Sequence, residues 1–156
     1  MTLGMRRLST VLAVAAALTL VLAACSKKTT GGGGAGASDC DSTTKVCVTE
    51  KDFAISSTPT SKDAGSVEMS VLNTGPSTHE FVVFKTDLAP DALPTNADGS
   101  VVEEDAKGVD LIGEIEDIAA NSVQSKSMQL ESGKYVFICN LPGHYKLGMY
   151  EGFTVS

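Results

Sequence analysis

Short segments in which hydrophobic and polar residues alternate, separated by turn residues, constrain the fold of this chain most strongly. Segment 66–72 shows the pattern best, with Val67, Met69 and Val71 between polar neighbours. A period of two places such side chains on one face of a half-buried strand. Further strands are expected around residues 46–55 and at 79–84, 122–130, 134–139 and 150–155. Several short strands with little helical periodicity predict an all-β fold, an antiparallel β-sandwich.

The stretch between residues 85 and 121 interrupts this pattern and carries most of the negative charge. Pro90 and Pro94 favour loops. Residues 87–117 contain ten acids and one base, a net charge of −9 in a 156-residue chain whose total is −7. We interpret this stretch as an acidic insertion, either a solvated loop with one or two short helical turns or a docking patch for a basic partner. The negative balance also argues against nucleic-acid binding.

The N-terminus has the pattern of an export signal. Arg6 and Arg7 precede an apolar run of 14 residues at 11–24, which is short for a membrane span. The run ends in Leu-Ala-Ala-Cys at 22–25, which resembles a bacterial lipobox, a signal whose cysteine is lipidated after cleavage. The alternative is an ordinary secretory signal with an incidental cysteine. We expect a lipoprotein signal peptide at 1–24 and a lipid on Cys25.

Residues 25–38 are expected to form a tether between this lipid anchor and a folded domain at 39–156. The segment includes four consecutive glycines at 31–34 and has almost no apolar side chains, so it cannot pack a core. A lipid anchor with a flexible tether suits a domain that meets its partners at a membrane surface. The expected location is therefore extracytoplasmic, at the cell surface or in the periplasm, with the protein anchored to the membrane.

Four cysteines occur in the chain, at positions 25, 40, 47 and 139. If Cys25 carries lipid, three remain. Cys40 and Cys47 are close in sequence, and an exported protein lives where disulfides persist, so we predict a disulfide between them rather than a free or metal-binding pair. Cys139 is then left without a cysteine partner, which makes its own neighbours worth attention.

Those neighbours are possible ligands for a soft metal ion. Cys139, His144 and Met149 lie within eleven residues of one another, on a loop between two expected strands, and His79 opens an earlier strand. Thiolate, imidazole and thioether together favour copper, and two His, one Cys and an axial Met form the donor set of a blue-copper electron-transfer site. Structural zinc and iron–sulfur clusters prefer more cysteines. A cysteine nucleophile with His144 as its base would leave Met149 and His79 unexplained.

With Asn73-x-Gly75 preceding His79, this loop resembles that of the cupredoxin family, most of all small blue copper proteins of the plastocyanin, auracyanin and sulfocyanin kind. The resemblance covers about residues 45–156. It implies a Greek-key β-sandwich and one mononuclear type 1 copper ion. The ligands carried over from the family are His79, Cys139, His144 and Met149. Glu80 departs from the pattern, because many family members have Asn after the first histidine.

The resemblance further implies a role as an electron shuttle rather than an enzyme, with His144 as the electron exit. The alternative is a copper carrier, scavenger or sensor at the cell surface without redox turnover. In the shuttle interpretation, the acidic residues Glu103, Glu104 and Asp105 would dock a redox partner with a basic surface, such as a cytochrome or an oxidase. The chain is expected to act as a monomer.

Overall fold

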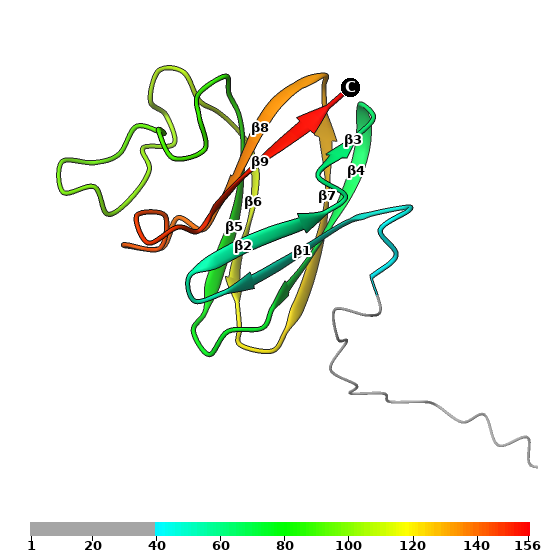
Figure 1. Cartoon of the computed structure of the whole chain (residues 1–156), viewed down its shortest axis with the longest axis horizontal. Helices are drawn as coiled ribbons and strands as arrows, with labels where there is room; N and C mark the ends of the chain where they lie inside the picture. The colour runs from blue at the N-terminus through cyan, green and yellow to red at the C-terminus, as the bar shows by residue number, and fades with distance from the viewer. Residues whose placement is uncertain (1–39) are drawn as a thin grey trace, which may run out of the picture. The chain divides into compact units, whose positions relative to one another are not determined.

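The computed structural model describes residues 40–156, which fold as a sandwich of two β-sheets (Figure 1). The first sheet has the strand order β2-β1-β4-β7, formed by Ala54–Thr58, Val46–Lys51, Gly65–Asn73 and Val123–Leu130. The second has the order β3-β9-β8-β5-β6, formed by Ser61–Lys62, Tyr150–Val155, Gly133–Ile138, His79–Lys85 and Asp110–Ile118. The expected all-β sandwich is confirmed. The signal peptide, Cys25 and the tether lie outside the described residues.

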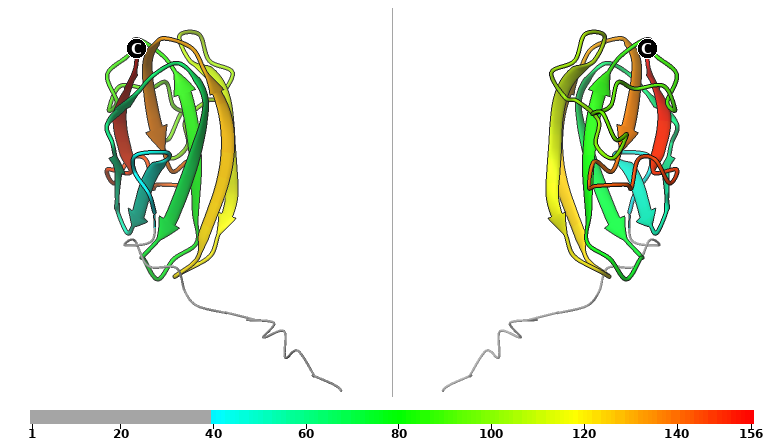
Figure 2. Two further views of the ribbon diagram at one scale, coloured as in Figure 1. Left: turned by 90° about the vertical axis from the view of Figure 1, so that its right-hand side faces the viewer. Right: turned by 90° about the vertical axis from the view of Figure 1, so that its left-hand side faces the viewer.

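The main core lies between the two sheets and is built from every second residue of their strands. Val46 and Val48 of β1 and Val67, Met69 and Val71 of β4 face the aromatic side chains of the opposite sheet. Those aromatic residues are Phe81, Phe137 and Phe153. The ring of Phe137 lies between the other two, about 5 Å from each. The side views in Figure 2 show the long strands of both sheets running along the length of the domain.

A second core covers the outer face of β5 and β8. Val82 and Phe84 on β5 and Val136 and Ile138 on β8 contact apolar residues of the insertion, chiefly Leu93, Val102 and Val109. This explains why β5 and β8 read as almost continuous apolar runs, since both of their faces are buried. The insertion, drawn in yellow-green beside the second sheet in Figure 1, therefore packs as part of the domain.

The structure corrects three expectations. The insertion is a loop without helical turns, and no helix forms anywhere in residues 40–156. Its last part is a nine-residue strand, β6, which pairs with β5 at the edge of the second sheet. The sheets are also not purely antiparallel, because β1 pairs with β4, and β3 with β9, in parallel. Accordingly, the described part of the chain has no helix long and apolar enough to cross a membrane.

The disulfide between Cys40 and Cys47 is confirmed, with a Cα–Cα distance of 5.9 Å. Cys47 lies in β1, so the bond fastens the segment entering the domain to the first sheet. Cys139 is the free cysteine of the described residues and is buried. A bond that closes so short a loop typically adds about 2–3 kcal/mol to the free energy of unfolding.

Candidate metal centre

The four residues singled out as copper ligands come from three places in the fold. His79 is the first residue of β5, Cys139 directly follows β8, and His144 and Met149 lie on the loop between β8 and β9. We call residues 139–149 the ligand loop; it is drawn in orange-red in Figure 1. Cys139, Met149 and His79 are fully buried, and His144 is partly buried. The two strands are not sequence neighbours, but β5 pairs directly with β8, which brings their ends together.

Three donor atoms converge at this place. The Nδ1 of His144 lies 3.3 Å from the Sγ of Cys139, and the Nδ1 of His79 lies 3.8 Å from the same sulfur. The two Nδ1 atoms are 3.3 Å apart. All three atoms lie within 4.8 Å of one another, so one ion can reach all of them. Two imidazoles and one thiolate are the strong ligands of a type 1 copper site.

The ligand loop is held in shape by its own backbone. The N–H of Cys139 donates to the carbonyl of Met149 (3.1 Å), which places the first and last ligands of the loop side by side. The N–H of Met149 in turn donates to the carbonyl of His144 (3.1 Å). Gly143 and Gly148 have φ values of 86° and 113°, which side chains rarely tolerate, so the loop needs glycine at both positions. The spacing of the ligands is therefore built into a closed, hydrogen-bonded loop.

His79 is presented by a turn that the sequence had already marked. The buried side chain of Asn73 donates to the carbonyls of Ser77 (2.7 Å) and Ile118 (2.9 Å), and its oxygen accepts from the N–H of Gly75 (2.8 Å). These bonds fix the chain between β4 and β5. The role of Asn73 is local and structural: it determines where β5, and hence His79, begins.

The sulfur of Cys139 also accepts a bond from the main chain. The backbone N–H of Glu80 lies 3.4 Å from Sγ. The unusual residue after His79 therefore still supplies a donor to the sulfur, because the donor is its backbone and not its side chain. The Glu80 carboxylate instead lies near Glu114 and Glu116, with which it forms a second group of closely spaced acidic oxygens.

Burial sets the protonation of the ligands. It raises the pKa of the Cys139 thiol to about 11 and lowers the pKa of both imidazoles. Without a metal, the thiol is protonated and the imidazoles are neutral near pH 7. A metal ion must therefore displace the thiol proton on binding, whereas the imidazole lone pairs are already free.

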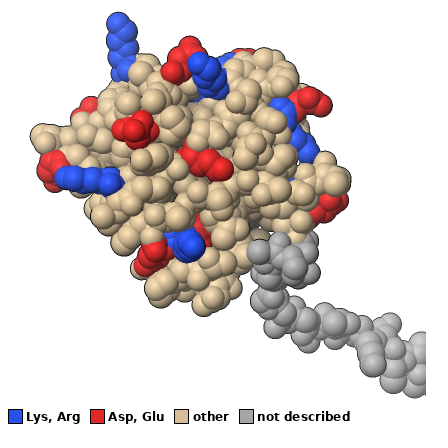
Figure 3. All heavy atoms as spheres, viewed as in Figure 1, with Lys and Arg blue, Asp and Glu red and all other residues tan. Residues whose placement is uncertain are grey.

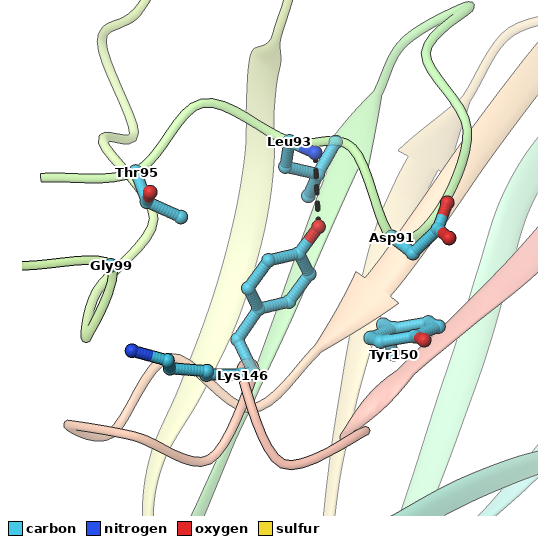
Figure 4. A pocket seen from close by; sticks show the side chains of 7 residues that line it. Asp91, Leu93, Thr95, Gly99, Lys146 and Tyr150 are labelled. Atoms are coloured by element: carbon cyan, nitrogen blue, oxygen red, sulfur yellow. Dashed lines mark hydrogen bonds between the residues drawn. The ribbon is translucent and has the colours of Figure 1, made fainter.

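Two buried side chains of the ligand loop, those of Asn140 and Tyr145, join the loop to the insertion, and neither contact was predicted from the sequence. Asn140 bonds to both backbone groups of Val102, at 2.8 and 3.1 Å, and to the carboxylate of Glu104 (2.8 Å). The hydroxyl of Tyr145 accepts from the N–H of Leu93, drawn as the dashed line in Figure 4, and donates to the carbonyl of Pro90, each at 2.9 Å. These partners lie 36 to 55 residues away in the sequence, a separation at which no local pattern gives a signal.

A shallow pocket of about 330 Å³ lies where the insertion meets the ligand loop (Figure 4). Its lining includes Asp91 and Thr95 from the insertion and Lys146 and Tyr150 from the ligand loop and β9. The ring of Tyr150 also packs 5.4 Å from that of Tyr145. The predicted ligands all lie outside this lining, so the pocket and the converging donor atoms are separate features.

The turn between β1 and β2 contributes two further residues that the sequence analysis missed. Asp52 lies 2.9 Å from the Nε2 of His79, and the ring of Phe53 meets that of His144 edge-on at 5.1 Å. One two-residue turn thus contacts both imidazoles. A carboxylate and an aromatic ring at positions 52 and 53 have no distinctive spacing from the ligands, so only the structure reveals them.

Comparison with known proteins supports the fold. The chain matches no family model and no curated protein. Among solved structures, it is similar to auracyanin B, with 25% identity and a TM-score of 0.53 over 72% of this chain and 88% of that one. A dithionite-reduced auracyanin from the photosynthetic bacterium Roseiflexus castenholzii has 19% identity and a TM-score of 0.53, over 72% and 97%.

Auracyanin A, described as a blue copper protein from the green thermophilic photosynthetic bacterium Chloroflexus aurantiacus, has 18% identity and a TM-score of 0.52 over 72% of this chain and 98% of that one. This chain therefore spans nearly the whole of each of these proteins. The described domain has a cupredoxin fold related to that of the auracyanins, and the cluster of His79, Cys139, His144 and Met149 is typical of a type 1 copper site.

Proposed function

We propose that this chain is a blue copper protein that carries single electrons between redox partners outside the cytoplasm. The observation that carries the proposal is the convergence of two imidazole Nδ1 atoms and the Cys139 sulfur within 4.8 Å. His79, Cys139 and His144 would hold one copper ion, with Met149 as the weak axial ligand. The similarity to auracyanins, one of which is described as a blue copper protein, supports the same interpretation.

The residues present fit copper by their chemistry. A thiolate and a thioether are soft ligands, and together with imidazole they favour copper over the harder divalent cations. Met149 is fully buried, and its backbone carbonyl accepts a bond from the N–H of Cys139, so the two residues lie side by side in the loop. Bound copper would supply a one-electron Cu(II)/Cu(I) couple.

The surrounding structure suits electron transfer because it keeps the ligands in place. His79 and Cys139 are fixed at the ends of paired strands, and the ligand loop is closed by the bonds between Cys139, His144 and Met149. A site that is already shaped for its ligands needs little rearrangement when the charge of the ion changes. This rigidity favours a shuttle over a carrier, which must open to release its metal.

His144 is the proposed point of electron exit. It is the one imidazole of the pair that is partly exposed, and its ring is met by that of Phe53 (42% exposed), while Leu147 (59% exposed) and Pro142 are exposed apolar residues of the same loop. An apolar rim lets a partner approach closely without the cost of removing water from charged groups. The edge-on contact with Phe53 keeps the imidazole in one orientation.

The proposed partner is a redox protein with a basic surface, such as a cytochrome or an oxidase, docking at Glu103, Glu104 and Asp105. Glu103 and Asp105 are exposed, whereas the carboxylate of Glu104 is engaged by Asn140. On the face seen in Figure 3, acidic and basic side chains are interspersed. Because eight other acidic residues of segment 87–117 remain, we expect Glu103→Gln/Asp105→Asn to reduce the association rate and its salt dependence only partly.

The proposed location is extracytoplasmic, with a lipid on Cys25 as the anchor, the signal peptide at 1–24, the tether at 25–38 and the protein acting as a monomer. The disulfide between Cys40 and Cys47 supports an oxidising compartment. Labelling with a radioactive fatty acid in a bacterial host would test the anchor. We expect the wild-type protein to take up the labelled fatty acid and Cys25→Ser to remain unlabelled. An unlabelled wild-type protein would contradict the lipid anchor.

The decisive experiment is the visible absorption spectrum of the full chain after addition of Cu(II), beside its Cys139→Ser variant. We expect an intense thiolate-to-copper band that the variant lacks, together with a reversible one-electron wave in voltammetry. Tight Cu(I) binding with rapid metal exchange, no band and no reversible wave would indicate a copper carrier instead. Absence of copper binding in both oxidation states would refute the proposed function.

A further inference from the structure

The carboxylate of Asp52 lies directly behind His79, on the side of the ring that faces away from the other ligands. Its Oδ1 is 2.9 Å from Nε2, while Nδ1 of the same ring faces the Cys139 sulfur. Both Oδ1 and Nε2 are shielded from solvent, and neither has another hydrogen-bond partner within residues 40–156. The pair does not meet the geometry of a linear hydrogen bond, so in the metal-free protein the carboxylate makes a close charge–dipole contact with the Nε2 edge of the neutral ring.

The position of the carboxylate is itself fixed from two sides. The hydroxyl of Ser77 donates to the other oxygen, Oδ2, at 2.6 Å. Gly75 packs against the contact so closely that a Cβ there would lie 2.6 Å from Oδ1 and 3.2 Å from the Nε2 of His79. Residue 75 must therefore be glycine for Asp52 and His79 to meet. The turn that presents His79 is thus also shaped to admit the carboxylate.

The second imidazole has no such partner. Within the described residues, no carboxylate lies in ion-pair contact with His144, whose ring is instead met by the apolar ring of Phe53. Asp52 and Phe53 are adjacent residues of one turn, so the chain places a charge on the buried imidazole and an uncharged ring on the partly exposed one. This difference between the two imidazoles indicates that the charge of Asp52 acts specifically on His79.

We propose that Asp52 is a positioning residue of the copper site, which keeps Nδ1 of His79 toward Cys139 and favours the cupric over the cuprous state. The inference rests on the proposed copper function. A carboxylate behind a metal-bound imidazole fixes which nitrogen carries the proton and makes the ring a stronger donor. Its negative charge also interacts more favourably with the higher charge of Cu(II) than with Cu(I).

The test compares the full-length protein with Asp52→Asn and with Asp63→Asn as the matched control. Asp63 is exposed, lies in the turn between β3 and β4, and its replacement changes the net charge equally. We expect Asp52→Asn to lower Cu(II) affinity about 10- to 100-fold, with a smaller loss for Cu(I). Each tenfold difference between the two losses raises the reduction potential by about 59 mV. The control should leave both affinities and the potential close to wild type.

Gly75→Ala provides a second variant that keeps the charge but pushes the carboxylate away from His79. It should weaken Cu(II) binding in the same direction, and it keeps the proposal testable if Asp52→Asn does not fold. In the metal-free wild-type protein, ¹⁵N NMR should show His79 as the tautomer with the proton on Nε2. A proton on Nδ1, or a potential unchanged in Asp52→Asn, would overturn the role of Asp52.

The two proposals fail in different ways. If the wild-type protein binds copper with a thiolate band but Asp52→Asn matches Asp63→Asn in potential and affinity, the copper function stands and the role of Asp52 is refuted. If the wild-type protein shows no such band and no copper binding, the copper function itself is refuted. The NMR measurement of the tautomer needs no metal and reads out the contact independently.

Discussion

His79 and His144 present the same atom, Nδ1, to Cys139, but they are held by different parts of the molecule. His79 begins a strand, is fully buried and has a carboxylate behind it. His144 lies on a loop, is partly buried and rests against Phe53. One side of the site is built into the sandwich and carries charge, whereas the other side meets the surface and is apolar. A single cluster of ligands can thus combine a fixed interior with an accessible contact.

The largest test of this difference is to remove each imidazole in turn. His144→Gly and His79→Gly should both abolish the thiolate-to-copper band. Added imidazole should restore it in His144→Gly, because His144 is partly exposed and lies against the exposed ring of Phe53. The fully buried position of His79 should not be refilled. The spectra with and without imidazole give the answer, and equal rescue of both variants would show that the two sides are equally accessible.

A second test concerns Glu50, a fully buried residue of β1 whose two carboxylate oxygens have no hydrogen-bond partner within the described part of the chain. Burial, with a contribution from the charge of Glu80, raises its pKa to about 8. Below pH 4.5, both the folded and the unfolded chain hold the proton. As the pH rises toward 8, the unfolded chain releases the proton but the folded chain keeps it, so the free energy of unfolding falls.

We therefore expect Glu50→Gln to stabilise the metal-free protein relative to wild type, by a margin that grows by about 3–4 kcal/mol between pH 5 and pH 8. Urea unfolding at several pH values measures this margin. Glu103→Gln, which alters an exposed acid of the insertion, is the control. A margin that does not change with pH would show that Glu50 is ionised in the folded protein.

The third test addresses the outer side, where Tyr145 fastens the ligand loop to the insertion. Tyr145→Phe removes the acceptor of the buried N–H of Leu93 and the donor to Pro90. Leaving a buried polar group unpaired costs about 1–3 kcal/mol of unfolding free energy. Tyr150→Phe is the matched control, since no bond to its hydroxyl is found in the described residues. In chemical denaturation of the metal-free proteins, Tyr145→Phe should lower the free energy of unfolding, whereas Tyr150→Phe should leave it close to wild type.

The smallest expected effect is that of Phe53→Leu. It removes the edge-on contact with His144 but keeps an apolar side chain, and such aromatic contacts contribute about 0.5–1.5 kcal/mol beyond burial. We expect a small shift in the copper band and a broader range of His144 orientations in electron paramagnetic resonance spectra. An identical spectrum would mean that the ligand loop alone orients this imidazole.

Strands β1, β4 and β7 could be predicted from their period of two and β5 and β8 from their apolar runs, but β6 could not. Its buried residues, Ile115 and Ile118, are three positions apart, and irregularities in its pairing with β5 account for this spacing. Asp117 adopts a φ of 53° within the same strand. Because β6 is an edge strand, it also carries exposed acidic side chains. In the sequence, these acidic residues suggest a loop. Alternation is a reliable signal only where pairing is regular.

The candidate ligands could be singled out because their chemistry is rare in this chain, which has two histidines and one unpaired cysteine beyond residue 47. Asp52 and Asn140 could not, because carboxylates and amides are common and nothing in their spacing marks them. Their roles arise from strand pairing: β1 and β2 place residue 52 beside His79, and the insertion folds back over β8 to meet residue 140. Residues that support a site are fixed by topology, which local sequence does not encode.

The bonds of Asn140 to Val102 have a consequence for engineering. Asn140 directly follows Cys139, and its side chain forms hydrogen bonds with both the N–H and the carbonyl of Val102 in the insertion. The insertion is therefore not an exchangeable module. Grafting another loop between β5 and β6 to change the partner would release Asn140 and disturb the residue beside the sulfur. The proposed partner surface and the proposed metal site are therefore joined by Asn140, and a redesign of the insertion would have to rebuild the surroundings of Cys139.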